Sequence, residues 1–179
     1  MCSISGFFHP FADYTSNKEE YQQILEHMTT TLYHRGPDES GHFLSKRCGL
    51  AHTRLSIIDL KTGSQPMEHQ VDGFSYQIAY NGEIYNLPVI KKDLLRLGYT
   101  FRTTSDTEVL LLCFLEYGPD FVRRIDGIFS FAIYDSRHET IYLFRDPFGI
   151  KPLFYTFLEN TLIFSSELKG LFCYPGITA

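Results

Sequence analysis

The chain has 179 residues, 44% of them hydrophobic and 16% aromatic, which is enough apolar material for one compact domain with a substantial core. Its net charge is −5 and its sixteen basic residues are dispersed, so the composition argues against nucleic acid and against an anionic membrane surface as partners. No apolar run approaches the ~18 residues of a membrane-spanning helix, and the first dozen residues do not resemble a signal peptide, which together predict a cytoplasmic protein.

The first predicted element is a strand over residues 3–8, which follows directly on Met1-Cys2. Removal of Met1, which the small second residue favours, would leave Cys2 with a thiol and a free α-amino group. A free α-amine titrates near pH ~7.7–8.0 and can take the proton of a thiol, so nucleophile and base would share one residue. Taken alone, the Met-Cys pair favours the alternative of an ordinary small residue that opens a strand.

A helix is predicted over residues 17–33, because a capping box at 16–19 precedes apolar residues at helical spacing. The helix ends in the loop 34–41, whose glycine and proline residues oppose its continuation. Two short strands, over residues 42–45 and 49–55, come next. They precede a long connection that runs to Pro66, and a connection of that length is more often functional than idle.

A strand over residues 74–80 runs into Asn81-Gly82, and a helix opened by Asn86 ends at Gly98. A further strand is predicted over 99–103. A second capping box, Ser105-Asp106-Thr107-Glu108, then opens a largely buried helix that runs through about residue 117. The last third predicts a dense sheet whose strands are apolar on both faces, over residues 129–135, 140–145, 153–157 and 162–166. Helices should cover one face of this sheet and a second sheet the other.

The cysteine and histidine residues predict no metal site. The four cysteines, Cys2, Cys48, Cys113 and Cys173, are far apart and form no CxxC pair, which argues against a zinc ribbon and against a dithiol redox motif. Cys113 lies in an apolar run and should be a buried small residue. The seven histidines have no metal-pair spacing.

Four groups could serve a nucleophile at Cys2. Asn81-Gly82 could aim a side-chain amide and a backbone N–H at one oxyanion, although the dipeptide alone favours a plain hairpin turn. Arg54 could hold a carboxylate, or it could be an exposed arginine at a strand end. Asp106 could bind an ammonium group, or it could only suit the dipole of its helix. Together they describe an amino acid that carries an acyl group. The fourth group, the loop Arg35-Gly36-Pro37-Asp38, could be a structural turn with an internal ion pair, and its residues alone assign it no chemistry.

Six ordered motifs carry a specific resemblance, namely Met1-Cys2, HRGPD at 34–38, AHTRLSIID at 51–59, YNGEIYN at 80–86, SDTE at 105–108 and RDPFGIKP at 145–152. With them the sequence resembles the amino-terminal glutaminase domain of glutamine-hydrolysing asparagine synthetases, which are class II amidotransferases of the Ntn-hydrolase superfamily. The resemblance covers essentially the whole chain, as far as Lys169, and implies an α+β fold in which two mostly antiparallel sheets lie between two helical layers (αββα).

The resemblance also implies the roles of individual residues. Cys2 would attack the side-chain amide of L-glutamine, with Asn81 and the Gly82 N–H stabilising the oxyanion, and the products would be glutamate and ammonia, formed through a γ-glutamyl thioester. The residues expected to bind the substrate are Arg54 at the α-carboxylate, Asp106 at the α-amino group, and Ile58 (through its backbone) and Glu83 at further contacts. Position 3 departs from the family, since Ser3 stands where glycine is usual and adds a side chain beside the nucleophile.

The glutaminase domain is expected to span residues 1–179 and to need no metal or organic cofactor. ATP and magnesium would belong to a synthetase domain, which this sequence does not contain and which would receive the ammonia. The last residues, 173–179, resemble an interdomain linker, which favours a piece of a longer protein over a stand-alone glutaminase. Two alternatives are a catalytically silent regulatory or interaction domain and the amidotransferase half of another class II enzyme. The complete site set disfavours the former, and the form of the Arg54 and Asn81 segments disfavours the latter.

Overall fold

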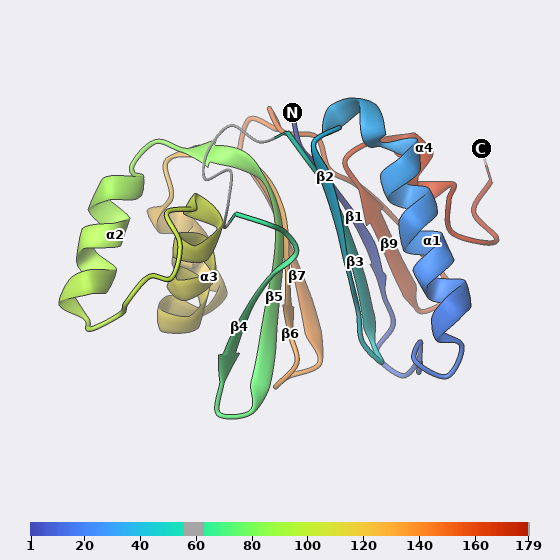
Figure 1. The fold of residues 1–179 in the computed structure, drawn as a ribbon, viewed down its shortest axis with the longest axis horizontal. Coiled ribbons are helices and arrows are strands. Elements are labelled where there is room, and N and C mark those ends of the chain that lie inside the picture. The colour runs from blue at the N-terminus through green and yellow to red at the C-terminus, as the bar shows by residue number, and fades with distance from the viewer. Residues whose placement is uncertain (56–62, 179) are drawn as a thin grey trace.

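The computed structural model describes residues 1–55 and 63–178 and shows two antiparallel sheets that face each other, with helices on both outer faces (Figure 1). The predicted four-layer arrangement is therefore confirmed. Among the described residues, no helix combines the length and the apolar character needed to cross a membrane.

The first sheet has five strands in the order β2-β3-β1-β9-β8. Their bounds are β1 Ser3–Phe8, β2 Glu39–Leu44, β3 Cys48–Arg54, β8 Phe154–Leu158 and β9 Thr161–Ser165. Helices α1 (Lys18–Thr31) and α4 (Leu168–Leu171) cover its outer face (Figure 1). Every residue of the inner strand β3 is buried, because α1 lies on one side of the strand and the second sheet on the other.

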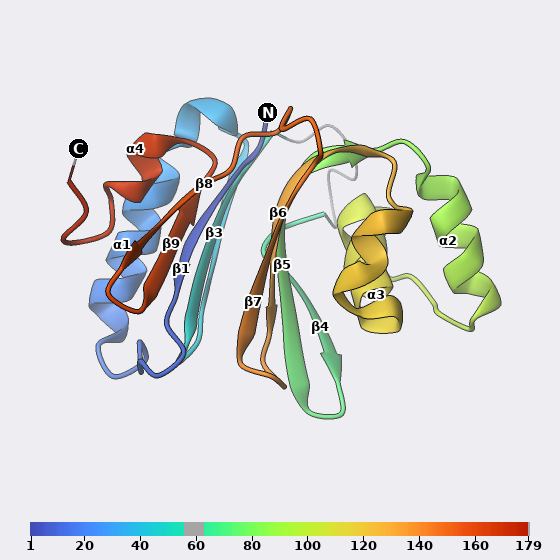
Figure 2. The ribbon, with the colours of Figure 1, turned by 180° about the vertical axis from the view of Figure 1, so that it is seen from behind.

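The second sheet has four strands in the order β4-β5-β6-β7. Their bounds are β4 Met67–Val71, β5 Phe74–Ile84, β6 Gly127–Asp135 and β7 Thr140–Arg145. Helices α2 (Leu87–Arg96) and α3 (Asp106–Tyr117) lie on its outer side, as the view from behind also shows (Figure 2). Short 3-10 helices, η1 Tyr33–Arg35 and η2 Gly118–Arg124, connect the elements.

The first predicted capping box is wrong. Helix α1 is capped by Asn17, whose side chain makes no capping bond and instead donates to Glu20. The Ser16 hydroxyl donates to the carbonyl of Asp13 at 2.7 Å, so the preceding turn already engages it. The second box is half formed, since Ser105 Oγ accepts the N–H of Thr107 at 3.2 Å.

The strand predicted over residues 99–103 is also absent. The Glu108 carboxylate, which should have reached back to Ser105, accepts the backbone N–H groups of Arg102 and Thr103 instead, at 2.7–3.1 Å. A buried carboxylate thus satisfies the donors that a neighbouring strand would otherwise need to pair.

Strand β4 was not expected from the sequence. It pairs with β5 in a hairpin whose two turn residues, Asp72 and Gly73, have φ values of 51° and 80°. Two left-handed residues in succession are typical of a type I′ turn, and Asp-Gly is the sequence signal for it. The long connection before Pro66 therefore leads into a strand at the edge of the second sheet.

Candidate active site

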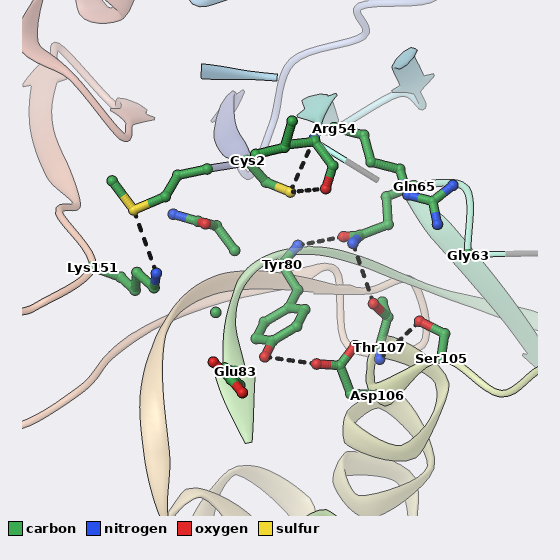
Figure 3. A pocket seen from close by; sticks show the side chains of 14 residues that line it. Cys2, Arg54, Gly63, Gln65, Tyr80, Glu83, Ser105, Asp106, Thr107 and Lys151 are labelled. Atoms are coloured by element: carbon green, nitrogen blue, oxygen red, sulfur yellow. Dashed lines mark hydrogen bonds between the residues drawn. The ribbon is translucent and has the colours of Figure 1, made fainter. Parts of the chain in front are cut away.

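A cavity of about 180 Å³ opens close to the N-terminus, between the ends of β1 and β3 in one sheet and of β5 in the other. This volume is several times the ~30 Å³ that one water molecule occupies in the liquid. Six of the seven predicted site residues line it, namely Cys2, Arg54, Asn81, Gly82, Glu83 and Asp106. The seventh, Ile58, lies outside the described residues. Figure 3 shows the cavity.

The Cys2 thiol lies at the start of β1 and is only partly buried. Its Sγ lies 3.4 Å from the N–H of Leu55, which donates to it, and 3.7 Å from the carbonyl of the same residue. Met1 also lines the cavity, and Lys151 Nζ lies 3.5 Å from the Met1 sulfur (Figure 3). The extra side chain of Ser3 points to the neighbouring strand, where its hydroxyl lies 2.6 Å from Thr53 Oγ1, so it does not enter the cavity.

The loop of the HRGPD motif supports both Cys2 and Arg54. Arg35 Nε donates to the carbonyl of Cys2 at 3.1 Å, and its Nη1 donates to Glu167 at 3.0 Å. Burial raises the pKa of Glu167, but hydrogen bonds from Arg35 and His34 outweigh it and hold that pKa at about 2. A Cβ on Gly36 would lie 2.6 Å from the Arg54 backbone, so only glycine fits there. Sequence reasoning assigned this loop no role, because none of these partners is near it in the chain.

Asn81 and Gly82 do not form a hairpin turn. Strand β5 continues through them to Ile84, and they pair with Ser130 and Phe129 of β6, because the long complementary strand β6 extends the ladder. Asn81 is 3% exposed, and within the described part of the chain its Nδ2 has no hydrogen-bond partner. An unpartnered buried donor is costly, so it indicates a place where a ligand oxygen could bind.

The Gly82 amide points the same way as that of Tyr80. The N–H and carbonyl of Phe129 both bond to Asp146 on the β7 side, so Phe129 and Gly82 form a non-hydrogen-bonded pair in the β5–β6 ladder. Tyr80, two residues earlier, likewise turns its N–H and carbonyl away from β6, toward Gln65 and His52. The Gly82 N–H is therefore directed away from β6, at the edge where the cavity lies.

Asp106 lies in the first turn of α3 and is 8% exposed. Burial raises the pKa of its carboxyl group, although hydrogen bonds from the Tyr80 hydroxyl, at 2.9 Å, and from the Thr107 backbone oppose the rise. A carboxylate whose charge is poorly solvated gains from a cation placed beside it. The buried Asp106 carboxylate should therefore bind an ammonium group more strongly than a solvent-exposed aspartate would.

Arg54 is not an exposed strand-end arginine, since it is 5% exposed and its Nη1 donates to Glu39 at 2.9 Å. Burial raises the pKa of Glu39, but hydrogen bonds from Ser64 and Arg54 lower it below the ordinary value, so the pair is ionised. The ion pair fixes the guanidinium at the wall of the cavity, while Glu83 is exposed at its rim. Among the described residues, no three His, Cys, Asp or Glu side chains lie together as a metal site would need.

Comparison with known proteins assigns the family. A model of the glutamine amidotransferase domain matches residues 1–179. The chain belongs to this family. This chain is 38% identical over 179 residues to the glutamine-hydrolysing asparagine synthetase 3 of Bacillus subtilis. The match covers all of this chain and 28% of that protein. The chain is also 38% identical to asparagine synthetase B of Escherichia coli, covering 96% of this chain and 30% of that protein.

The fold matches solved amidotransferases as well. The glutamine phosphoribosylpyrophosphate amidotransferase of B. subtilis superposes with a TM-score of 0.77 at 21% identity, covering 96% of this chain and 43% of that one. At this identity the likeness shows the fold alone, two antiparallel sheets with helices on both outer faces. The chain spans under a third of the length of the asparagine synthetases of B. subtilis and E. coli that it matches.

Proposed function

We propose that this domain hydrolyses the side-chain amide of L-glutamine, with Cys2 as the nucleophile. One observation carries the proposal: a single cavity brings together the thiol of Cys2, the buried Asn81 Nδ2, which has no partner among the described residues, a cation at Arg54 and a buried carboxylate at Asp106. These groups complement the amide, the α-carboxylate and the α-ammonium of one amino acid.

The chemistry begins once Met1 has been removed. The free α-amine of Cys2 takes the thiol proton, and the sulfur forms a bond with the amide carbon of glutamine. The carbonyl oxygen becomes an oxyanion, which Asn81 Nδ2 and the Gly82 N–H stabilise. When the C–N bond breaks, the amine of Cys2 returns its proton to the nitrogen and ammonia leaves. Water then attacks the γ-glutamyl thioester and frees glutamate and the thiol.

The two charged groups on the α-carbon of the substrate are held by opposite charges. Arg54 binds the α-carboxylate and Asp106 the α-ammonium, and Glu83 and Ile58 add contacts. Since both charged partners are buried, they bind their counter-charges with little competition from water. No step uses a metal or an organic cofactor in this domain.

The relatives' names support a partner for the ammonia. Because the similar proteins are glutamine-hydrolysing asparagine synthetases and are far longer than this chain, we assign the ammonia to a synthetase domain, on the same polypeptide or separate from it. ATP and magnesium would serve that domain. The same names disfavour an amidotransferase of another class II pathway, and the gathered site residues disfavour a silent domain. The cytoplasmic location stays a prediction.

A covalent label tests the function directly. A glutamine-mimicking electrophile, such as a diazoketone analogue, is expected to add one adduct mass to the processed domain, and peptide mapping should place it on Cys2. Excess L-glutamine should protect the thiol, because both ligands need Arg54 and Asp106. An adduct on Cys48, Cys113 or Cys173, or labelling that glutamine does not slow, would contradict the assignment.

Replacing Asn81 with alanine tests the oxyanion site. We expect kcat for ammonia release to fall by roughly 10²–10³, about 2.7–4 kcal/mol, because one donor to the oxyanion is lost. KM for glutamine should change little, since Asn81 does not bind the charged groups on the α-carbon. Asn17→Ala is the matched control, because Asn17 is exposed and distant from the cavity. A rise in KM without a fall in kcat would show that Asn81 binds the ground state instead.

A further inference from the structure

A buried glutamine of the protein itself, Gln65, joins the two elements that would hold the two ends of the substrate. It lies at the end of the connection that follows Arg54, and it lines the cavity. Its side chain is labelled in Figure 3, between Tyr80 and Thr107. None of the catalytic steps above uses it.

The Gln65 carboxamide extends the edge of the sheet beside β5, just before β4 begins. The β4–β5 register pairs Met67 with Ile78, so the same register would place Gln65 opposite Tyr80. There the side chain replaces the backbone: Gln65 Oε1 accepts the Tyr80 N–H at 2.6 Å. The Gly82 N–H is the next one along this edge of β5, and it lies beyond the reach of β4. Gln65 thus accepts one backbone N–H on this edge of β5 and leaves the next N–H, that of Gly82, for the substrate oxygen.

The other end of the carboxamide reaches helix α3. Gln65 Nε2 donates to Thr107 Oγ1 at 3.2 Å, and Thr107 directly follows Asp106. All three partners are shielded from water, with Gln65 9%, Tyr80 3% and Thr107 1% exposed. Buried hydrogen bonds of this kind hold their partners in fixed positions, because breaking one leaves an unpaired polar group.

We infer that Gln65 is a positioning residue that sets the spacing between the oxyanion donors on β5 and Asp106 on α3. This inference rests on the proposed function, in which glutamine spans that gap with its amide at one end and its α-ammonium at the other. A fixed spacing selects a substrate of one chain length that carries an α-ammonium group. The tie between Tyr80 Oη and Asp106, at 2.9 Å, is the second link across the same gap.

The test compares two substrates, L-glutamine and glutaramate, which is the same chain without the α-amino group. In Gln65→Met, kcat/KM for glutamine is expected to fall by roughly 10–100-fold, because small misplacements of a bound group cost that much. The constant for glutaramate should change little, since that ligand does not engage Asp106 and is indifferent to the spacing. The inhibition constant of glutaramate against glutamine hydrolysis is also measured, so that a binding constant is obtained even if glutaramate is hydrolysed slowly.

Thr107→Val removes the same hydrogen bond from the α3 side. It should likewise lower kcat/KM for glutamine relative to the constant for glutaramate, which keeps the test valid if Gln65→Met folds poorly. The matched control is Gln70→Met, since Gln70 is exposed on β4 and does not line the cavity. If the wild type hydrolyses glutamine but both variants lower the two constants equally, or lower neither, the positioning role is wrong. A processed wild type that releases no ammonia would instead contradict the proposed function.

Discussion

Cys2→Ala is expected to abolish the release of ammonia from glutamine. The substitution removes the sulfur that would form the thioester, and the α-amine that remains has no thiol to deprotonate. Losses on the order of 10⁶ in kcat accompany removal of the nucleophile from a nucleophile–base unit. Since Cys2 is only partly buried and makes weak contacts to Leu55, the fold should be unchanged. Ammonia release, followed with a coupled assay, is the measurement.

Cys113→Ala is the matched control because it removes the same atom from a different place. Cys113 lies in α3, is 2% exposed and packs in the apolar core between that helix and its sheet. Burial raises the pKa of its thiol to about 12, so the thiolate is scarce at neutral pH. This variant should lose roughly 0.5–3 kcal/mol of stability and retain its activity. Comparable activity in Cys2→Ala and Cys113→Ala would refute the nucleophile assignment.

The layers of the fold follow from the sequence, because the apolar patterns of its strands and helices are strong. Strands β1 and β7 have the predicted bounds. The runs that are apolar on both faces form strands that are covered on both faces, as β6 shows. An exception is β8, which lies at the edge of its sheet and leaves Tyr155 and Phe157 more than 60% exposed. Hydrophobic pattern alone does not distinguish an edge strand from a central one.

The site was harder to predict because distant partners override local signals. Asn-Gly favours a tight turn by its own conformational preferences, yet pairing with β6 keeps Asn81-Gly82 in an extended strand. The family resemblance named residues that the structure brings together in one cavity, which the dipeptide alone did not suggest. Its assignment of catalytic roles stays a prediction.

The contacts of the residues that position the site residues are not marked by any short motif in the sequence. Arg35 contacts Cys2 across 33 positions, and Gln65 replaces a strand backbone with its side chain. Such contacts depend on the packed fold, so neither periodicity nor a short motif reveals them. The long connection before Pro66 was the one hint, since a functional role was expected for it.

Retention of Met1 is expected to silence the domain even though six of the predicted site residues already line one cavity. In the structure Met1 is present, so the nitrogen of Cys2 is an amide and carries no basic lone pair. A positioned general base contributes roughly 10²–10⁴-fold, and this contribution would be lost. Met1 also lines the cavity, where its side chain would compete with the substrate for space.

The measurement uses a chain in which a cleavable peptide replaces Met1, so that one protease step exposes the amine of Cys2. Intact mass spectrometry reports the processing, and ammonia release is followed before and after cleavage of the same sample. We expect activity to appear in proportion to the cleaved fraction. The same chain with Cys2→Ala should stay inactive after cleavage, which separates the thiol from the new terminus. Equal activity before and after cleavage would show that another base takes the thiol proton, and the site would then resemble a cysteine–base pair made from two residues.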